Sequence, residues 1–397
     1  MMAAGTAGNR GKKVLLLEKN NILGKKLNIT GGGRCNITNA EYNIREFIKH
    51  YGKAEHFLYS AFSQFGVEET FNFFESKGLP LVVQARKRAF PHTEKSIDVC
   101  NVMKKYIKDV NVSVKTGVNV NKISIKDNKI LGIISGSDIY TADSYILATG
   151  GMSHPETGST GDGFKWLEAI GHSVKQSSPT IVPIATKENW SKVLSGVSLS
   201  FMKITFFIDN KKSFSKKGKI LFTHFGLSGP LILNSSSTIS DLLQSGGRVT
   251  ATIDAFPDTE INLLEERIIK FFDKNKNKKL KNVLPLISPE GISPGIELLL
   301  SDIEIDTKVH SITKDQRKKI VNLLKALPLT VDHLMGYDRA VVADGGVNLE
   351  EIDTKTMRSR IFDNLYITGD LLNINRPSGG YSLQLCWTTG YIAGINV

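Results

Sequence analysis

The spacing of apolar positions divides the first part of the chain into short strands and helices. Residues 13–18 form an apolar run that ends at Glu18, and the small residues before it predict a helix that stops at Gly11. Regularly spaced phenylalanines predict helices between residues 44 and 78, and a further helix is expected to begin at Ser96. The chain therefore opens as a helix, a turn and a strand.

Glycine-rich stretches and β-branched runs follow one another in the next part of the chain. Residues 21–40 are glycine-rich and polar, which predicts a loop outside the core, and a glycine loop within 158–171 is expected to open a helix. Residues 81–92 are strand-like. Four further β-branched runs predict one small sheet that ends in YILATGG: 111–120, 122–126, 129–134 and 138–148.

The pattern changes near residue 189 and changes back near residue 337. Between these points, short alternating strands (197–208, 219–223 and 248–253) precede a mostly helical, lysine-rich region at 258–326. After residue 337 the strand-and-glycine pattern returns. The simplest organisation is a discontinuous α/β domain of residues 1–188 and 337–397, with residues 189–336 inserted into it.

Composition limits the class of protein. Of the 397 residues, 41% are hydrophobic and 23% are charged, as in ordinary globular domains. No apolar run reaches the ~18 residues of a transmembrane helix, and no apolar leader segment opens the chain. The three cysteines lie far apart and the histidines are scattered, which argues against a disulfide scaffold and a metal site. We therefore expect a cytoplasmic protein that binds neither metal nor membrane.

The charge balance points to polyanionic partners. Lysine and arginine number 51 against 39 acidic residues, which gives a formal net charge of +12. Many of these lysines fall in two clusters of the inserted region: Lys211, Lys212, Lys216, Lys217 and Lys219, and Lys274, Lys276, Lys278, Lys279 and Lys281. Such lysines could grip RNA phosphates. A lysine-rich genome composition is the alternative explanation of both clusters.

Two candidate ligand-binding segments lie near the start of the chain. Glu18 ends a predicted strand, where an acid can bind both ribose hydroxyls of an adenosine, and Lys19 is grouped with it. Taken alone, Glu18 is more commonly explained as a solvated acid at a strand end. The segment TGGGRCNITN allows close backbone approach to a planar or phosphate-bearing ligand, with a fixed positive charge beside it. Its candidate contacts are Gly31, Gly32, Gly33, Arg34 and Cys35.

Three further segments carry the pattern of a flavin-binding α/β domain. In YILATGG a strand runs into residues suited to the adenosine half of the cofactor: Ala148, Thr149, Gly150 and Gly151. In LYITGD, Gly369 and Asp370 follow a strand, and the acid could accept hydrogen bonds from the ribityl hydroxyls, or simply cap a helix. A last helix opens at Gly379 and Gly380, followed by Tyr381 and Ser382, and its positive end suits the flavin O2/N1 edge.

The combination of motifs resembles the BaiN/RdsA-like family of NAD(P)/FAD-dependent oxidoreductases, also called YhiN-like flavoproteins. Five segments carry the resemblance in order over nearly the whole chain: LLEKNNILGKKLNITGGGRCNITN, AFPHTEKSIDV, ILATGGMSHPETGSTGDGF, FTHFGLSGP and MRSRIFDNLYITGDLLNINRPSGGYSLQLCWTTGYIAG. The resemblance implies a glutathione-reductase-like FAD-binding Rossmann-type domain with an inserted β pseudo-barrel and helical domain.

The sequence departs from the family pattern in two places that bear on cofactor binding. Aligned on Glu18, the last glycine of the family's GxGxxG would fall just before Met1, so we expect an upstream extension of the reading frame to restore this motif and its strand. The family usually has an acidic residue and a glycine where this chain has Asn373 and Arg376.

The resemblance implies NAD(P)H-dependent reduction of an electron-poor C=C bond, with NADPH or NADH binding transiently beside FAD. Cys35, His154 and Tyr381 are candidate proton donors by chemical type. The family suggests two substrates, a uridine of large-subunit ribosomal RNA that becomes dihydrouridine and an unsaturated 3-oxo bile acid, and we rank the RNA first because of the basic charge. A flavin-binding protein without catalysis is a third hypothesis.

Overall fold

A computed structural model describes residues 1–397. The chain forms two compact units, one of Met1–Pro179 with Ala340–Val397 and one of Thr180–Arg339. The first boundary lies before the expected position at residue 189, because the strand at 184–186 already belongs to the inserted unit. The alternating pattern becomes obvious only after this short strand, which explains the difference.

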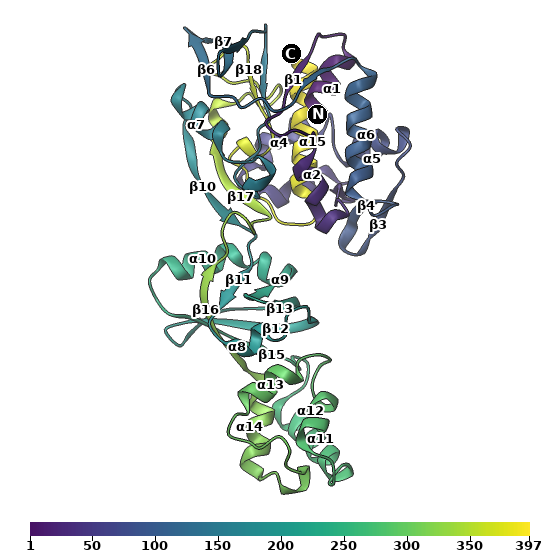
Figure 1. Ribbon diagram of the computed structural model, residues 1–397, viewed down its shortest axis with the longest axis vertical. Coiled ribbons are helices and arrows are strands. Elements are labelled where there is room, and N and C mark those ends of the chain that lie inside the picture. The colour runs from purple at the N-terminus through teal and green to yellow at the C-terminus, as the bar shows by residue number, and fades with distance from the viewer. The chain divides into compact units, whose positions relative to one another are not determined.

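Two parallel strand pairs form the centre of the first unit (Figure 1). Strand β1 (Leu15–Leu17) pairs with β5 (Ser113–Lys115), and β9 (Tyr145–Leu147) pairs with β18 (Leu365–Ile367). The expected single small sheet over 111–148 is therefore wrong: only its middle strands form an antiparallel meander, and β5 and β9 pair with distant strands. That meander consists of β6 (Lys122–Lys126), β7 (Lys129–Ser135) and β8 (Asp138–Tyr140).

Helices α1 (Met2–Asn9) and α15 (Tyr381–Asn396) bring the two ends of the chain together (Figure 1). A Cβ on Gly394 would lie 2.6 Å from the carbonyl oxygen of Ala3, so a glycine is needed for this close approach. Helix α6 (Ser96–Asp109) also packs against α1. The predicted opening helix, strand and closing helix are all present.

The segment 21–40 is not the exposed loop that its polarity predicts. It contains helix α2 (Lys25–Ile29), a 3-10 turn at Thr30–Gly33 and strand β2 (Thr38–Asn39). The side chains of Leu27, Cys35 and Ile37 are buried in an apolar cluster. The left-handed glycines fold this polar stretch back against the core, which residue polarity alone does not reveal.

The remaining elements of the first unit surround these strands. Strands β2, β4 and β3 form a small antiparallel sheet, and β10 pairs with β17. The further elements of this unit are α3 (Ile44–Ile48), α4 (Glu55–Phe62), α5 (Val67–Ser76), β3 (Leu81–Gln84), β4 (Arg88–Pro91), α7 (Asp162–Ala169), β10 (Val174–Thr180) and β17 (Val342–Val347). Short 3-10 turns lie at Lys49–Ala54, Ala85–Lys87, Pro155–Thr157, Leu349–Glu351 and Gly369–Leu371.

A closed barrel of six strands forms the centre of the second unit. Its strands, in the order in which they pair, are β11 (Ile184–Thr186), β14 (Gly226–Ser228), β13 (Lys211–Thr223), β12 (Ser198–Ile208), β15 (Val249–Asp254) and β16 (Leu327–Leu334). Alternate residues such as Ile204 and Phe206 are buried inside it. The lysines of the first cluster lie along strand β13 and not in a barrel turn, where they were expected. The turn before β13 consists of Asp209 and Asn210.

Helices continue the apolar core of the barrel, and one cluster of buried residues includes both. These helices are α8 (Asn189–Lys192), α9 (Pro230–Leu233), α10 (Ser236–Gln244), α11 (Ile261–Lys274), α12 (Leu280–Ile287), α13 (Ser293–Leu299) and α14 (Lys314–Lys325), with a 3-10 turn at Val309–Ser311. None of the helices in the structure has the length and apolar character needed to span a membrane.

Candidate functional site

Glu18 and Lys19 follow β1, and this strand end is linked to the segment around the start of α7 through Asn20 and Lys19. One oxygen of Glu18 accepts hydrogen bonds from the backbone and the side chain of Asn20, both at 2.8 Å. Asn20 in turn donates to the carbonyl of Thr157 at 2.9 Å. The Lys19 ammonium lies 2.8 Å from Asp162 Oδ2. The acid at the strand end is thus held in place, and Lys19 fastens this end to α7.

Ala148 and Thr149 are exposed directly after the buried end of β9. Gly163 of α7 faces Thr149 so closely that a Cβ there would lie 2.1 Å from Thr149 Oγ1. Gly151 faces Asp370, since its Cβ would lie 3.4 Å from Asp370 Cβ. The ATGG segment therefore presents open main chain close to the end of β18.

Lys26 is a residue that sequence reasoning missed. Its ammonium lies 3.3 Å from Ser153 Oγ, and a Cβ on Gly150 would lie 4.0 Å from the same Nζ. Burial lowers the pKa of Lys26, and the nearby Asp370 acts in the opposite direction. Because Lys26 sits in a lysine-rich chain, only its position on α2 distinguishes it from the surface lysines.

Asp370 is paired with Arg376, the residue that departs from the family pattern. The Arg376 guanidinium is buried, and its Nη2 donates to Asp370 Oδ1. Its Nε donates to Ser382 Oγ at 3.0 Å and its Nη1 to the carbonyl of Ile374 at 2.7 Å. The arginine thus brings together two predicted contacts, Asp370 and Ser382, from different motifs.

Gly380 places the N-terminus of α15 directly against β2. It has φ 105°, and a Cβ would lie 2.3 Å from the carbonyl carbon of Thr38. Asn39 Nδ2 donates to the carbonyl of Gly379 at 3.3 Å, and Thr38 Oγ1 donates to Gln384 Oε1 at 2.6 Å. The segment that contains the glycine triplet therefore meets the start of the last helix, although more than three hundred residues separate them.

Gly31, Gly32 and Gly33 all have left-handed backbone angles and are exposed. Arg34 lies over the Phe90 ring at 4.5 Å and its Nη1 is 3.4 Å from Glu94 Oε2, so its charge is partly balanced. The side-chain oxygen of Asn36 is buried without a hydrogen-bond partner. Buried oxygens without a hydrogen-bond partner are rare in proteins. A ligand that donates a hydrogen bond could therefore bind at the end of this glycine segment.

The structure does not bring the three candidate proton donors together. Cys35 is buried in an apolar cluster, and burial raises the pKa of its thiol to about 12, so the packing explanation fits it better. Tyr381 is buried among Phe47, His50 and Tyr51, and burial raises the pKa of its phenol. His154 is half-buried with φ 52°, and its Nδ1 lies 2.9 Å from Glu156 Oε1.

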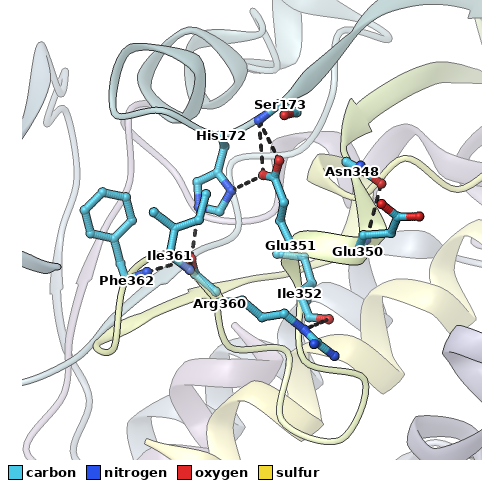
Figure 2. A network of polar contacts seen from close by, with 10 residues as sticks. His172, Ser173, Asn348, Glu350, Glu351, Ile352, Arg360, Ile361 and Phe362 are labelled. Atoms are coloured by element: carbon cyan, nitrogen blue, oxygen red, sulfur yellow. Dashed lines mark hydrogen bonds and ion pairs between the residues drawn. The ribbon is translucent and has the colours of Figure 1, made fainter.

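A buried Ser–His–Glu network lies apart from these segments in the sequence, and nothing in the sequence points to it (Figure 2). His172 Nδ1 lies 2.7 Å from Glu351 Oε2, and its Nε2 lies 3.0 Å from Ser359 Oγ. Ser359 Oγ accepts from the amides of Ile361 and Phe362, so its single proton is donated to His172 Nε2. Since Ser359 and His172 are both buried, the network clamps two chain segments and exposes no nucleophile.

The side chains also do not gather into a metal centre: no group of three or more His, Cys, Asp or Glu residues could hold an ion.

Two curated relatives cover nearly the whole chain. A 3-dehydro-bile acid delta(4,6)-reductase of Clostridium scindens is 28% identical over 96% of this chain and 92% of its own. A ribosomal RNA dihydrouridine synthase of Haemophilus influenzae is 26% identical over 100% of this chain and 95% of its own.

Solved structures share the fold at low identity. The 3-ketosteroid-delta4-(5alpha)-dehydrogenase of Rhodococcus jostii is 13% identical, with a TM-score of 0.52 over 100% of this chain and 93% of that chain. The FrdA chain of E. coli quinol fumarate reductase is 14% identical, with a TM-score of 0.53 over 99% of this chain and 67% of that chain.

Residues after β1, on α2 and after the glycine turn fit the FAD that this fold implies. Glu18 supplies an acid, Lys26 a half-buried cation beside exposed main chain, and Asn36 a buried oxygen in need of a donor. The predicted α/β fold of an FAD-dependent oxidoreductase is confirmed by the family comparison, which matches residues 1–396. The chain belongs to the family described as the HI0933-like protein Rossmann domain.

Proposed function

We propose that this protein reduces the activated C=C bond of a uridine in large-subunit ribosomal RNA to give dihydrouridine, with FAD as resident cofactor and NADPH or NADH as the electron source. Both kinds of curated relative bear names of enzymes that act on C=C bonds, one on a bile acid and one on ribosomal RNA. One chemistry serves both: hydride reaches the β-carbon of an enone-like system and a proton reaches its neighbour.

FAD, when bound, supplies the hydride transfer; this chain supplies binding and positioning. Thr149 and Lys26 lie where the main chain after β9 is open to a ligand, and Lys26 would balance negative charge there. The N-terminal end of α15 would favour the negative charge that builds on the flavin edge, and Gly380 lets that end approach β2 closely. Asp370 would accept from a ribityl hydroxyl while Arg376 fixes its orientation.

Of the three candidate donors, His154 fits proton delivery to the substrate best. It is the only one of the three that is not buried, and it lies three residues after Gly151, the last residue of the ATGG segment. Its carboxylate partner Glu156, at 2.9 Å, holds the ring in one orientation. Cys35 is a poor acid at a pKa of about 12 and lies within the core.

The basic surface of the inserted unit is the observation that favours RNA. The side chains of Lys211, Lys212 and Lys219 of β13 are exposed and form no hydrogen bond or ion pair within the chain. In the second cluster, Lys279 and Lys281 both pair with Asp306, at 2.7 and 2.8 Å. The unpaired lysines of β13 are therefore stronger candidates for phosphate contacts than Lys279 and Lys281.

Ribosomal RNA from cells that lack this gene tests the proposal. After digestion to nucleosides, mass spectrometry should show less dihydrouridine than in the parent strain, and the intact gene should restore it. The same gene with His154→Asn should restore it only partly. An unchanged dihydrouridine content in the deleted strain would exclude the RNA substrate.

A small-molecule ene-reductase is the second candidate, because the bile acid reductase is as similar to this chain as the RNA enzymes are. NADPH oxidation by the purified protein with an unsaturated 3-oxo steroid, in the absence of oxygen, tests it. Turnover with the steroid but not with unmodified ribosomal RNA would put this candidate first.

A further inference from the structure

An exposed aromatic ring in a strained backbone position lies on the outer surface of the barrel. Phe201 of β12 is 78% exposed, the highest value among the large exposed apolar side chains. Its φ is 62°, in the left-handed region that a bulky side chain rarely adopts. Since the ring buries little surface and the backbone angle is unfavourable, stability does not explain a phenylalanine here.

A β-bulge produces this exposure. The register between β12 and β13 shifts between Leu199 and Met202, so that Ser200 and Phe201 are both exposed while Leu199 and Met202 are buried. The bulge thus turns the ring out of the barrel at a fixed point of the strand. Bulges of this kind commonly re-aim a side chain toward a ligand.

Lysines flank the ring on the same hairpin. Lys203 and Lys217 are paired across β12 and β13, and Lys219 lies opposite the bulge, between the partners of Met202 and Leu199. Two acids beside this hairpin are already paired: Asp258 pairs with Lys217 at 2.6 Å, and Asp254, the β15 partner of Lys203, pairs with Lys325 at 2.7 Å. Lys203 and Lys219 therefore leave net positive charge beside Phe201.

We propose that Phe201 is a stacking platform for an unpaired RNA base, with Lys203 and Lys219 contacting the neighbouring phosphates. An exposed aromatic ring among lysines is the combination with which proteins hold single-stranded nucleic acid, because every base offers a flat face. The inference rests on the proposed RNA substrate and deepens it: it assigns the binding of a single-stranded segment to the inserted unit.

Binding of a fluorescein-labelled oligouridine to the full-length protein tests the platform. Phe201→Ala should weaken binding about tenfold or more, and Phe201→Trp should retain affinity and show quenched tryptophan fluorescence when RNA is bound. Val193→Ala, a change at another exposed apolar residue of this unit, is the matched control and should leave binding unchanged. Equal affinity of Phe201→Ala and the parent protein would overturn the proposal.

Salt dependence separates the ring from the lysines. Lys203→Gln and Lys219→Gln should each reduce the slope of log affinity against log salt by about 0.7, whereas Phe201→Ala should leave the slope unchanged. Phe201→Gly should not lower the thermal midpoint, because it relieves the backbone strain; a large loss would show a packing role instead. RNA binding that depends on Phe201 without any RNA reduction would contradict the proposed function and leave the platform standing.

Discussion

At the scale of single residues, Gly380 shows how one glycine joins two motifs. Its left-handed angle and the Thr38 backbone 2.3 Å from a Cβ position both exclude a side chain. Gly380→Ala should therefore destabilise the protein by ~3 kcal/mol or more, the sum of the left-handed penalty and a clash with immobile backbone. Gly171→Ala is the matched control, since Gly171 has φ 104° and nothing within 4 Å of a Cβ, and it should carry only the ~1–2 kcal/mol backbone penalty. Equal urea midpoints of the two variants would contradict the close approach.

Asp370 is proposed to bind FAD, and it also forms a buried ion pair with Arg376. Asp370→Ala should weaken FAD affinity by ~1.5–3 kcal/mol, or about 10- to 150-fold, through loss of a charge-assisted hydrogen bond. It also leaves the buried Arg376 charge without its partner, which typically costs ~3–5 kcal/mol of stability. Asp338→Ala removes an acid from an exposed pair with Arg339 and should cost at most ~1 kcal/mol. Unchanged flavin retention, measured at a temperature where the variant is folded, would restrict Asp370 to the structural role.

His172 makes stability depend on pH. Burial lowers the pKa of its imidazole below the ordinary value of 6.5, against the opposing effect of Glu351. The unfolded chain then binds the proton more readily, so the contribution of neutral His172 is fully present above about pH 6.5 and is lost as pH falls below it. The pKa of Glu351 is also lowered: burial raises it, but hydrogen bonds from Ser173 and His172 outweigh this, so acid weakens the same clamp further.

Thermal unfolding between about pH 7.5 and about pH 5.5 measures this contribution. The midpoint of the parent protein should fall more over this range than that of His172→Gln, which has no imidazole to titrate. A variant at the exposed His333 serves as control and should behave like the parent. Parallel pH profiles of the parent and His172→Gln would contradict the assignment.

The types of the candidate site residues can be predicted from the sequence, but their contact partners cannot. Glu18, Asp370 and the glycines of α15 stand at the ends of recognisable strands and helices, and the structure has them there. The pairing of Asp370 with Arg376, the position of Lys26 and the clamp at His172 depend on contacts between distant segments. No local pattern encodes such contacts, so the sequence could not reveal them.

Among the secondary-structure elements, strand β13 supplies the lysines that are proposed to contact RNA. Replacing Lys211, Lys212 and Lys219 by glutamine should lower RNA affinity and reduce the salt slope by up to about 2, with ~0.7 for each lost phosphate contact. Replacing Lys279 and Lys281 should have less effect, because Asp306 already neutralises part of their charge. Filter binding of unmodified ribosomal RNA over a salt series compares the two variants. Equal losses, or none from either, would contradict a specific role of β13.

Strand and helix positions follow from the apolar pattern wherever the elements are long. The alternation in β12 and the phenylalanines of α4 and α5 place these elements closely. Short strands escape detection: β2 has two residues and β11 has three, and both lie in stretches without clear periodicity. The pairing of β9 with β18 joins segments more than two hundred residues apart, so a local sequence pattern cannot predict it.

Across the whole molecule, the family shows an oxidoreductase with an FAD-type Rossmann domain, and the proposed RNA contacts lie on the inserted barrel unit. The net charge of +12 and the exposed lysines of β13 favour a polyanionic RNA partner over a small molecule that carries few charges. If lysine richness only reflected genome composition, these lysines would form an ordinary solvated surface and activity would be insensitive to salt.

Anaerobic reoxidation of the reduced holoprotein shows whether ribosomal RNA accepts electrons from the flavin. The FAD-loaded protein is reduced with NADPH in the absence of oxygen, excess NADPH is removed, and acceptors are added while the flavin absorbance is followed. We predict that unmodified large-subunit ribosomal RNA restores the oxidised spectrum and gains dihydrouridine in equal amount, and that moderate salt slows this step. Reoxidation by an unsaturated 3-oxo steroid with no response to the RNA would contradict the account.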